Sequence, residues 1–179
     1  MQQRLMFAQE PYYQQIPPAE LPPVTRRPVH IVLDNIRSAY NVGSIFRTAD
    51  AGAALHMHLC GMTAYPPNIK LAKTALGAMD YVPWTYYPRT MDCVEALRRE
   101  RVSIVAIETA PGAVAHTAYP WPQPVAIVFG HEVRGVAPDV LDAADAAAVI
   151  PMSGYKNTIN VATAFGVVLF EILRRWGCC

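Results

Sequence analysis

Short runs of hydrophobic residues alternate along the chain with segments whose hydrophobic positions recur every three or four residues. Continuous apolar runs of about four to eight residues are typical of buried parallel strands. Such runs, one of them rich in aromatics, predict strands over residues 29–33, 55–60, 81–86, 102–107, 125–129 and 146–150. Helical spacing predicts helices over residues 42–51, 67–76 and 91–100, a short one from Pro138, and a long one from Val161. The alternation predicts an α/β fold with a mostly parallel sheet flanked by helices.

The first 28 residues differ from the rest because prolines are dense there. Six prolines fall between residues 11 and 28, and proline breaks helix interiors and cannot donate a ladder hydrogen bond. We therefore predict two parts, a Pro-rich N-terminal lead segment at residues 1–28 and one folded domain at residues 29–179.

The composition is that of a globular protein without a strong charge bias. Hydrophobic residues make up 53% and charged residues 16%, which favours a packed core over disorder. The net charge is only +1, whereas a strongly basic chain would point at once to nucleic acid. A local basic patch and an ordinary solvated surface both remain open for the cations of the first half, among them Arg37, Arg47, Lys70 and Lys73.

Several kinds of chemistry are disfavoured by missing motifs. The sequence contains no G-x-G-x-x-G loop, no P-loop and no G-x-S-x-G elbow, which disfavours diphosphate-bound cofactors and covalent hydrolysis. Four cysteines show neither metal spacing nor a disulfide framework, which favours a reducing, cytoplasmic setting. His56 and His58 would share one strand face as half a metal site, but no third ligand is evident, so packing is favoured and no metal is predicted. No membrane association is expected, since neither a membrane-length apolar run nor a signal-peptide core is present.

Three polar clusters carry the functional prediction. The first is N-V-G-S-I-F-R at residues 41–47, the second G-H-E-V-R-G at 130–135, and the third I-P-M-S-G at 150–154 followed by T-I-N at 158–160. Each comes after a predicted strand, and ligands of open α/β sheets bind at the carboxyl ends of the strands. We therefore expect the polar side chains of these clusters to share one pocket: Asn41, Arg47, Glu132, Thr158 and Asn160.

Arg47 lies on an otherwise apolar helix and would be costly to bury without a partner. That partner could be Asp34 or Asp50, or Glu132 across the pocket. Glu132 could instead cap the turn that follows it. Asn41 is expected to cap the helix that contains Arg47.

Taken together and in this order, the motifs N-x-G-x-x-x-R, F-G-x-E-x-x-G and I-P-M-x-G-x-x-x-T-x-N-V resemble the three signature motifs of the SPOUT superfamily. The resemblance covers roughly residues 29–175 and is strongest to the TrmH-type RNA 2′-O-ribose methyltransferases. It implies a deep C-terminal trefoil knot, S-adenosylmethionine (AdoMet) as cofactor, tRNA or rRNA as partner, and a homodimer with the last helix in its interface. It also implies cofactor contacts from Thr109, Ala110, Phe129, Gly130, Ile150, Met152 and Asn160.

The resemblance also assigns roles, with the active positions at Asn41, Arg47, Glu132, Thr158 and Asn160. Thr158 stands where serine is common in the family. A guanidinium is almost always protonated, so we expect Arg47 to bind an RNA phosphate and stabilise the developing oxyanion rather than act as a base. Glu132 would orient Arg47 or relay the proton. Further phosphate contacts are predicted for Arg26, Arg27, Lys70, Lys73 and Lys156.

Three other functions remain compatible with the sequence. The first is a non-catalytic RNA-binding SPOUT protein, and the second is a SPOUT enzyme that methylates a base nitrogen. The third, from a different class, is a metabolite-binding α/β module without an RNA partner. The five filled polar positions argue against the first, and the early Asn–Arg cluster is more like the ribose group than the base group.

Overall fold

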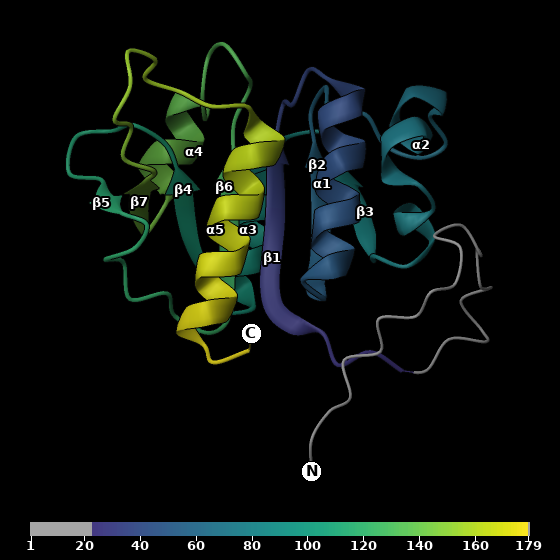
Figure 1. Cartoon of the computed structure of the whole chain (residues 1–179), viewed down its shortest axis with the longest axis horizontal. Coiled ribbons are helices and arrows are strands. Elements are labelled where there is room, and N and C mark those ends of the chain that lie inside the picture. The colour runs from purple at the N-terminus through teal and green to yellow at the C-terminus, as the bar shows by residue number, and fades with distance from the viewer. Residues whose placement is uncertain (1–22, 179) are drawn as a thin grey trace.

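The computed structural model describes residues 23–178, and within them the chain builds a seven-stranded sheet with helices on both faces (Figure 1). The strands are β1 (Arg27–Asp34), β2 (Ala54–Cys60), β3 (Trp84–Tyr87), β4 (Ser103–Ile107), β5 (Val114–Ala115), β6 (Val125–Phe129) and β7 (Ala146–Val149). Their order is β3-β2-β1-β6-β4-β7-β5, and every neighbouring pair is parallel. The predicted α/β fold with a mostly parallel sheet is confirmed.

The helices form one layer on each face of the sheet. In the described residues they are α1 (Ala39–Ala51), α2 (Ile69–Ala75), the 3₁₀ helix η2 (Ala78–Asp80), α3 (Thr90–Arg99), α4 (Pro138–Ala143) and α5 (Val161–Arg175). Figure 1 shows α1 and α5 on the near face, with α2 beside α1, and α3 and α4 behind the sheet. Gly43 lets α2 approach α1, because a Cβ there would lie 2.3 Å from the Leu71 carbonyl oxygen.

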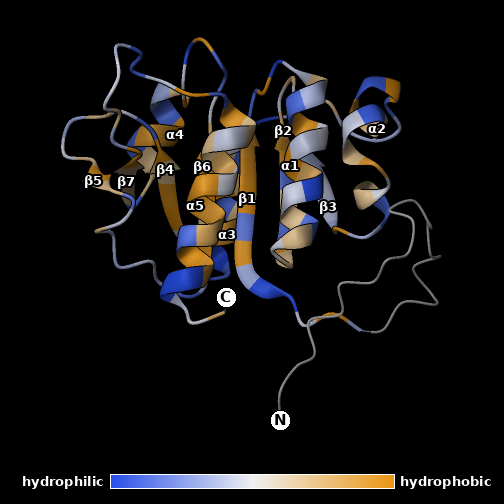
Figure 2. Cartoon of the chain, viewed as in Figure 1, coloured by the Kyte–Doolittle hydropathy of each residue, from blue (hydrophilic) through white to orange (hydrophobic). Residues whose placement is uncertain are grey.

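The core has two parts, one on each face of the sheet. Ile31 and Leu33 point from β1 into the larger cluster under α1 and α5, while Val32 points into the smaller cluster under α3 and α4. Figure 2 shows hydrophobic colour along much of the central strands and on part of α5, whereas hydrophilic colour lies on parts of α1, at the lower end of α5 and in several loops. Phe129 at the end of β6 packs edge-on against Phe165 of α5, with ring centroids 5.7 Å apart. This contact fixes the first turns of α5 beside the carboxyl ends of the strands.

The start of α1 differs from its prediction. The helix begins at Ala39 rather than Val42, and Ser38 rather than Asn41 is its N-cap, with the Ser38 hydroxyl accepting a hydrogen bond from the Asn41 N–H at 3.4 Å. Serine is as good a cap as asparagine, so the helix gains an earlier turn. The Asn41 side chain is thereby free for the contacts described below.

Other element boundaries shift for similar local reasons. Helix α2 begins at Ile69 rather than at residue 67, because the Asn68 side chain accepts hydrogen bonds from the amides of Lys70 and Leu71 and caps it. Strand β3 begins at Trp84 rather than Tyr81, because the amides of Tyr81 and Val82 bind the Ala78 carbonyl oxygen in the turn that ends η2. Strand β5 was not predicted, since two residues carry no recognisable pattern.

In the C-terminal half of the chain, the order of the strands in the sheet differs from their order in the sequence. Strands β4, β5 and β6 follow one another in sequence, yet β7 lies between β4 and β5 in the sheet. The segment between β4 and β6 therefore runs outward past β7 and back again. After β7 the chain returns to place α5 against α1, so residues 150–160 cross the ends of β4 and β6.

No helix in residues 23–178 combines the length and the apolar character that a membrane span requires. The predicted lead segment lies mostly outside the described residues, although Arg27 and Pro28 already belong to β1.

Candidate active site

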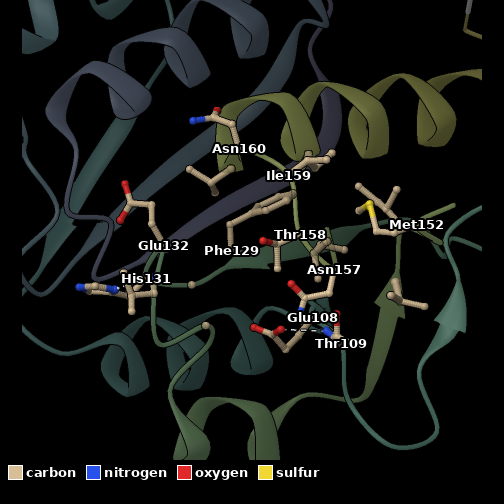
Figure 3. Close-up of a pocket in the computed structure, with 18 of the residues that line it drawn as sticks. Glu108, Thr109, Phe129, His131, Glu132, Met152, Asn157, Thr158, Ile159 and Asn160 are labelled. Carbon is tan, nitrogen blue, oxygen red and sulfur yellow. Dashed lines mark hydrogen bonds between the residues drawn. The ribbon is translucent and has the colours of Figure 1, made fainter. Parts of the chain in front are cut away.

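The three polar clusters of the sequence meet at one cavity of about 660 Å³, a size that suits a small-molecule cofactor. The cavity lies at the carboxyl ends of β4, β6 and β7 and at the start of α5 (Figure 3). It is lined by residues 107–109, 129–135, 149, 150, 152, 156–161 and 164. Of the predicted site residues, Glu132, Thr158 and Asn160 line this cavity directly.

A chain of side-chain hydrogen bonds joins the three clusters. Glu132 Oε1 accepts a hydrogen bond from Asn41 Nδ2 at 2.9 Å, and Asn41 Oδ1 accepts one from Asn160 Nδ2 at 3.1 Å. Asn160 is also the N-cap of α5, since its Oδ1 accepts from the amides of Ala162 and Thr163. The start of α1, the loop after β6 and the start of α5 are therefore held together by one continuous polar contact.

Glu132 is held as an anion by the segment that precedes α1. Its Oε2 accepts from the Arg37 N–H at 2.8 Å and its Oε1 from the Ser38 N–H at 3.0 Å. Partial burial raises the pKa of Glu132, but hydrogen bonds from these amides, from its own N–H and from Asn41 outweigh it, so the pKa lies below its usual range. Glu132 is thus ionised at neutral pH. Among the described residues, Glu132 neither caps the following turn, whose amides bind His131, nor pairs with Arg47 of the same chain.

Arg47 stands apart from the cavity of its own chain. It lies six residues after Asn41 on α1, roughly 9 Å farther along the helix axis. Its side chain is exposed, and it does not line the cavity. Among the described residues, no salt bridge joins it to Asp34, Asp50 or Glu132. The predicted pairings of Arg47 are therefore not formed within one chain.

The loop after β6 is rigid because several of its amides are bound internally. His131 Nδ1 accepts a hydrogen bond from the Val133 N–H, and the His131 carbonyl accepts from the Gly135 N–H at 2.8 Å. Gly135 has a φ of +72°, and a Cβ there would lie 2.3 Å from Glu108 Oε2. The left-handed backbone therefore favours glycine at residue 135, and a Cβ there would force the Glu108 carboxylate to shift.

Glu108 is a cavity residue that was not predicted. It follows β4, and its carboxylate accepts hydrogen bonds from the amides of Thr109 at 2.8 Å and Val136 at 3.0 Å. Arg134 and His131 also line the cavity without having been predicted as site residues. The G-H-E-V-R-G cluster contained both, but only its glutamate had a family role to draw attention to it.

The lining fits AdoMet. The cofactor residues predicted from the resemblance line the cavity, except Ala110: Thr109, Phe129, Gly130, Ile150, Met152 and Asn160. Apolar side chains such as Phe129 and Met152 offer a surface for a flat adenine ring, and the carboxylates of Glu108 and Glu132 suit the positive charge of a sulfonium.

Of the predicted phosphate contacts, only Lys156 lines the cavity. Lys70 and Lys73 are exposed on α2, which packs beside α1. Arg26 and Arg27 lie at the opposite end of β1, which separates them from the cavity edge by roughly 23 Å.

Arg26 has a structural role at that far end. Its guanidinium donates hydrogen bonds to the carbonyl oxygens of Ala54 and Tyr81, and it lies near Asp50. It therefore ties the start of β1 to β2 and to the segment after η2.

The histidines pack against one another across β1 and β2, as predicted for His56 and His58. His30 Nδ1 and His58 Nε2 are 3.1 Å apart, and His56 Nε2 contacts Thr85 Oγ1 at 2.8 Å. No group of three or more His, Cys, Asp or Glu in residues 23–178 has an arrangement that could hold a metal ion. Cys60 is a buried free thiol on the same face of the sheet.

The fold and this cavity define an α/β protein with a cofactor-sized pocket at the carboxyl ends of its strands. The family model of the SpoU rRNA Methylase family matches residues 28–170. The chain belongs to this family, and the resemblance predicted from the three motifs is confirmed.

Individual relatives agree with this assignment. The tRNA (guanosine(18)-2′-O)-methyltransferase of Thermus thermophilus is 29% identical over 145 residues, which cover 81% of this chain and 74% of that protein. The SpoU methyltransferase AviRb from Streptomyces viridochromogenes, solved in complex with AdoMet, is 26% identical with a TM-score of 0.77, covering 88% of this chain and 64% of that one. The AdoMet-bound rRNA methyltransferase from Sinorhizobium meliloti is 30% identical with a TM-score of 0.77, covering 89% and 60%. The chain thus spans about three fifths of the length of these two solved relatives.

Proposed function

We propose that this chain is an AdoMet-dependent RNA methyltransferase that modifies a ribose 2′-hydroxyl of tRNA or rRNA. The observation that carries the proposal is the hydrogen-bonded chain from Glu132 through Asn41 to Asn160 at the rim of an AdoMet-sized cavity. It joins the three family motifs in one site. Relatives named as tRNA and rRNA 2′-O-methyltransferases support the same reaction.

AdoMet supplies a methyl group bound to a positively charged sulfur, which an oxygen nucleophile can attack. The residues of this chain bind and orient. Phe129, Gly130, Ile150 and Met152 hold the cofactor at the strand ends, with Thr109 at the neighbouring edge. Thr158 lines the cavity beside them and offers a hydroxyl toward the reacting groups. Holding the two reactants in an aligned geometry lowers the barrier by up to about 7–11 kcal/mol.

The ribose hydroxyl is a weak nucleophile until it loses its proton, so the site must stabilise the negative charge that develops on it. Arg47 takes this role by binding the adjacent phosphate and the developing oxyanion. Glu132 is saturated with hydrogen bonds and ionised. It therefore acts by fixing Asn41 and the start of α1 rather than by relaying a proton.

The active unit is a homodimer through α5. The outer faces of α1 and α5 lie side by side and carry exposed Tyr40, Val167 and Phe170. Arg47 is exposed on α1 and lies outside its own cavity. A second copy placed across these helices brings the Arg47 of one protomer to the cavity of its partner.

The C-terminal segment forms the trefoil knot of the family. Support comes from the strand order, in which β7 lies between β4 and β5, so that the segment from β4 to β6 passes around it. The crossing of residues 150–160 over the ends of β4 and β6 is the part of the knot that closes the cavity.

The RNA contacts extend from Lys156 and Arg134 at the cavity to Lys70 and Lys73 on α2. The predicted lead segment precedes one folded domain, which begins with β1 at Arg27 rather than at residue 29. An enzyme that modifies tRNA or rRNA works in the cytoplasm, where these RNAs function.

The decisive experiment is mass-spectrometric mapping of ribose methylation in RNA from cells that lack this gene. We expect one 2′-O-methylnucleotide of tRNA or rRNA to disappear and to return when the wild-type gene is restored. Loss of a base methylation would instead identify an enzyme that acts on a base nitrogen. An unchanged set of modifications would contradict catalysis.

A further inference from the structure

Two loops border the mouth of the cavity, and each presents an exposed apolar side chain beside a cation. In the loop after β6 these are Val133 and Arg134, both of which line the cavity. In the loop between β7 and α5 they are Tyr155 and Lys156, of which Lys156 lines the cavity. Tyr155 is fully exposed, with a relative accessibility of 111%. An aromatic ring in this position contributes nothing to the core.

The two loops are held differently. The loop after β6 is fixed from within by His131 and from below by Glu108. Between Pro151 and Asn160, by contrast, every residue except Met152 is exposed. In the part of the chain that the structure describes, no hydrogen bond or ring contact engages the Tyr155 side chain. Figure 3 shows Asn157 and Thr158 of this second loop on the opposite side of the cavity from His131 and Glu132.

We propose that Tyr155 is a stacking platform for the RNA base next to the methylated nucleotide, with Lys156 and Arg134 binding the flanking phosphates. This inference rests on the proposed function and adds a positioning residue to it. Every nucleobase has a π face that stacks on an exposed aromatic ring, and two cations about the mouth of one cavity suit a phosphate backbone that passes over it.

The proposal also specifies the class of substrate. In a paired A-form helix the bases are stacked on one another and their faces are covered, whereas loops and bulges present splayed bases that aromatic side chains can stack on. A base on Tyr155 with its neighbouring ribose in the cavity therefore requires an unpaired stretch of RNA. The target nucleotide lies in a loop or bulge.

The test is methyl transfer from radiolabelled AdoMet to RNA prepared from cells that lack this gene, measured against RNA and AdoMet concentration separately. Tyr155→Ala is expected to raise the KM for RNA at least fivefold, because stacking on one base is lost. The KM for AdoMet and the affinity for S-adenosylhomocysteine should stay within twofold. Tyr155→Phe keeps the ring and should remain within twofold of wild type. Val24→Ala, an exposed apolar residue at the other end of the sheet, is the control and should change nothing.

Each other outcome overturns the proposal. A KM for RNA within twofold in Tyr155→Ala shows that no base stacks there. A loss in Tyr155→Phe equal to that in Tyr155→Ala assigns the effect to the hydroxyl, and weakened S-adenosylhomocysteine binding assigns it to the cofactor loop. A changed oligomeric state of Tyr155→Ala in size-exclusion chromatography assigns the residue to the dimer interface.

Chemical probing of the target RNA gives a second, independent readout, since a methylated nucleotide inside a stable duplex contradicts the predicted substrate class. Failure of the proposed function looks different from failure of the stacking proposal. Wild-type protein that transfers no methyl group to this RNA overturns both. Active wild-type protein with an equally active Tyr155→Ala overturns only the role of Tyr155.

Discussion

Two networks of hydrogen-bonded side chains in this protein have opposite effects on charge: one keeps a carboxylate ionised and the other keeps imidazoles neutral. At the cavity, Glu132, Asn41 and Asn160 are linked by hydrogen bonds at the surface. Within the sheet, His30 and His58 contact each other while buried under the opposite helix layer. Both networks lower pKa values, but a lowered pKa keeps a carboxylate charged and keeps an imidazole neutral.

The physical difference is solvation. Glu132 remains exposed enough to keep part of its hydration and gains amide donors, so the hydrogen bonds outweigh the desolvation. The imidazoles are desolvated and surrounded by each other: desolvation, followed by the charges that His56 and His30 would carry, lowers the pKa of His58 to about 3. Charge is therefore available on Glu132 at the cavity, where a reaction can use it, whereas the histidines of the sheet stay neutral.

The largest effect on activity should follow from removing Arg47, the cation that lies outside the hydrogen-bonded network of Glu132, Asn41 and Asn160. Arg47→Ala is expected to reduce kcat on the order of 100- to 1000-fold, the usual loss for a group that stabilises developing negative charge. Cofactor affinity should stay within a few fold, because the proposed contacts of Arg47 are with the RNA phosphate and the developing oxyanion rather than with the cofactor. Tritium-methyl transfer and titration calorimetry with S-adenosylhomocysteine measure the two quantities. Near-normal turnover would reject the assignment of Arg47.

The histidines of β1 and β2, His30, His56 and His58, should make the protein sensitive to mild acid. Their pKa values lie below the unfolded value of about 6.5, so between the folded and unfolded pKa values the unfolded chain binds more protons. The free energy of unfolding therefore falls as the pH drops below about 6.5, by up to about 1.4 kcal/mol per pH unit for each histidine that stays neutral.

Urea denaturation between pH 7.5 and pH 4.5 tests this difference between the networks. The pKa of Glu132 is lower in the folded than in the unfolded chain. Its contribution to the free energy of unfolding is therefore complete above the unfolded pKa and is lost only as the pH falls below it. In this window the slope should come mainly from the histidines and should flatten in His58→Phe. An equal slope in that variant would contradict the role of His58.

The loop that carries Glu132 can be tested through its glycine. Gly135→Ala should destabilise the protein by about 1–3 kcal/mol, because the left-handed backbone is strained for alanine and the new Cβ meets Glu108. Gly112→Ala is the matched control, since residue 112 has a φ of +78° but no atom within 4 Å of the added Cβ. The excess loss in Gly135→Ala over the control, from thermal denaturation, measures the contact with Glu108. Equal losses would show that the contact does not matter.

The smallest effect on stability should come from replacing Asn160, which hydrogen-bonds to Asn41 at the cavity. Asn160→Ala removes the N-cap of α5 and should cost about 1 kcal/mol, together with a loss of activity because Asn41 loses its partner. Asn68→Ala removes the equivalent cap of α2, away from the cavity, and should cost similar stability while activity is retained. Equal activity in the two variants would mean that the Asn41–Asn160 contact has no catalytic importance.

The sequence by itself determined most of the elements and the three motifs, although it missed β5 and misplaced the starts of α1, α2 and β3. The apolar run at residues 125–129 and the three- and four-residue spacing after Val161 are local patterns, and both elements were found where they were expected. The three polar clusters were also recognised from the chain alone, because their order and spacing match a family signature.

Only the tertiary structure decided which groups meet. Glu132 binds amides about 95 positions earlier in the chain rather than Arg47, and Glu108 enters the cavity beside the Gly135 loop. Arg26 is committed to carbonyl groups at the far end of the sheet. Spacing along the chain sets helices and strands because their hydrogen bonds are local or repetitive. Contacts between distant residues depend on strand order and packing, which local sequence patterns do not encode.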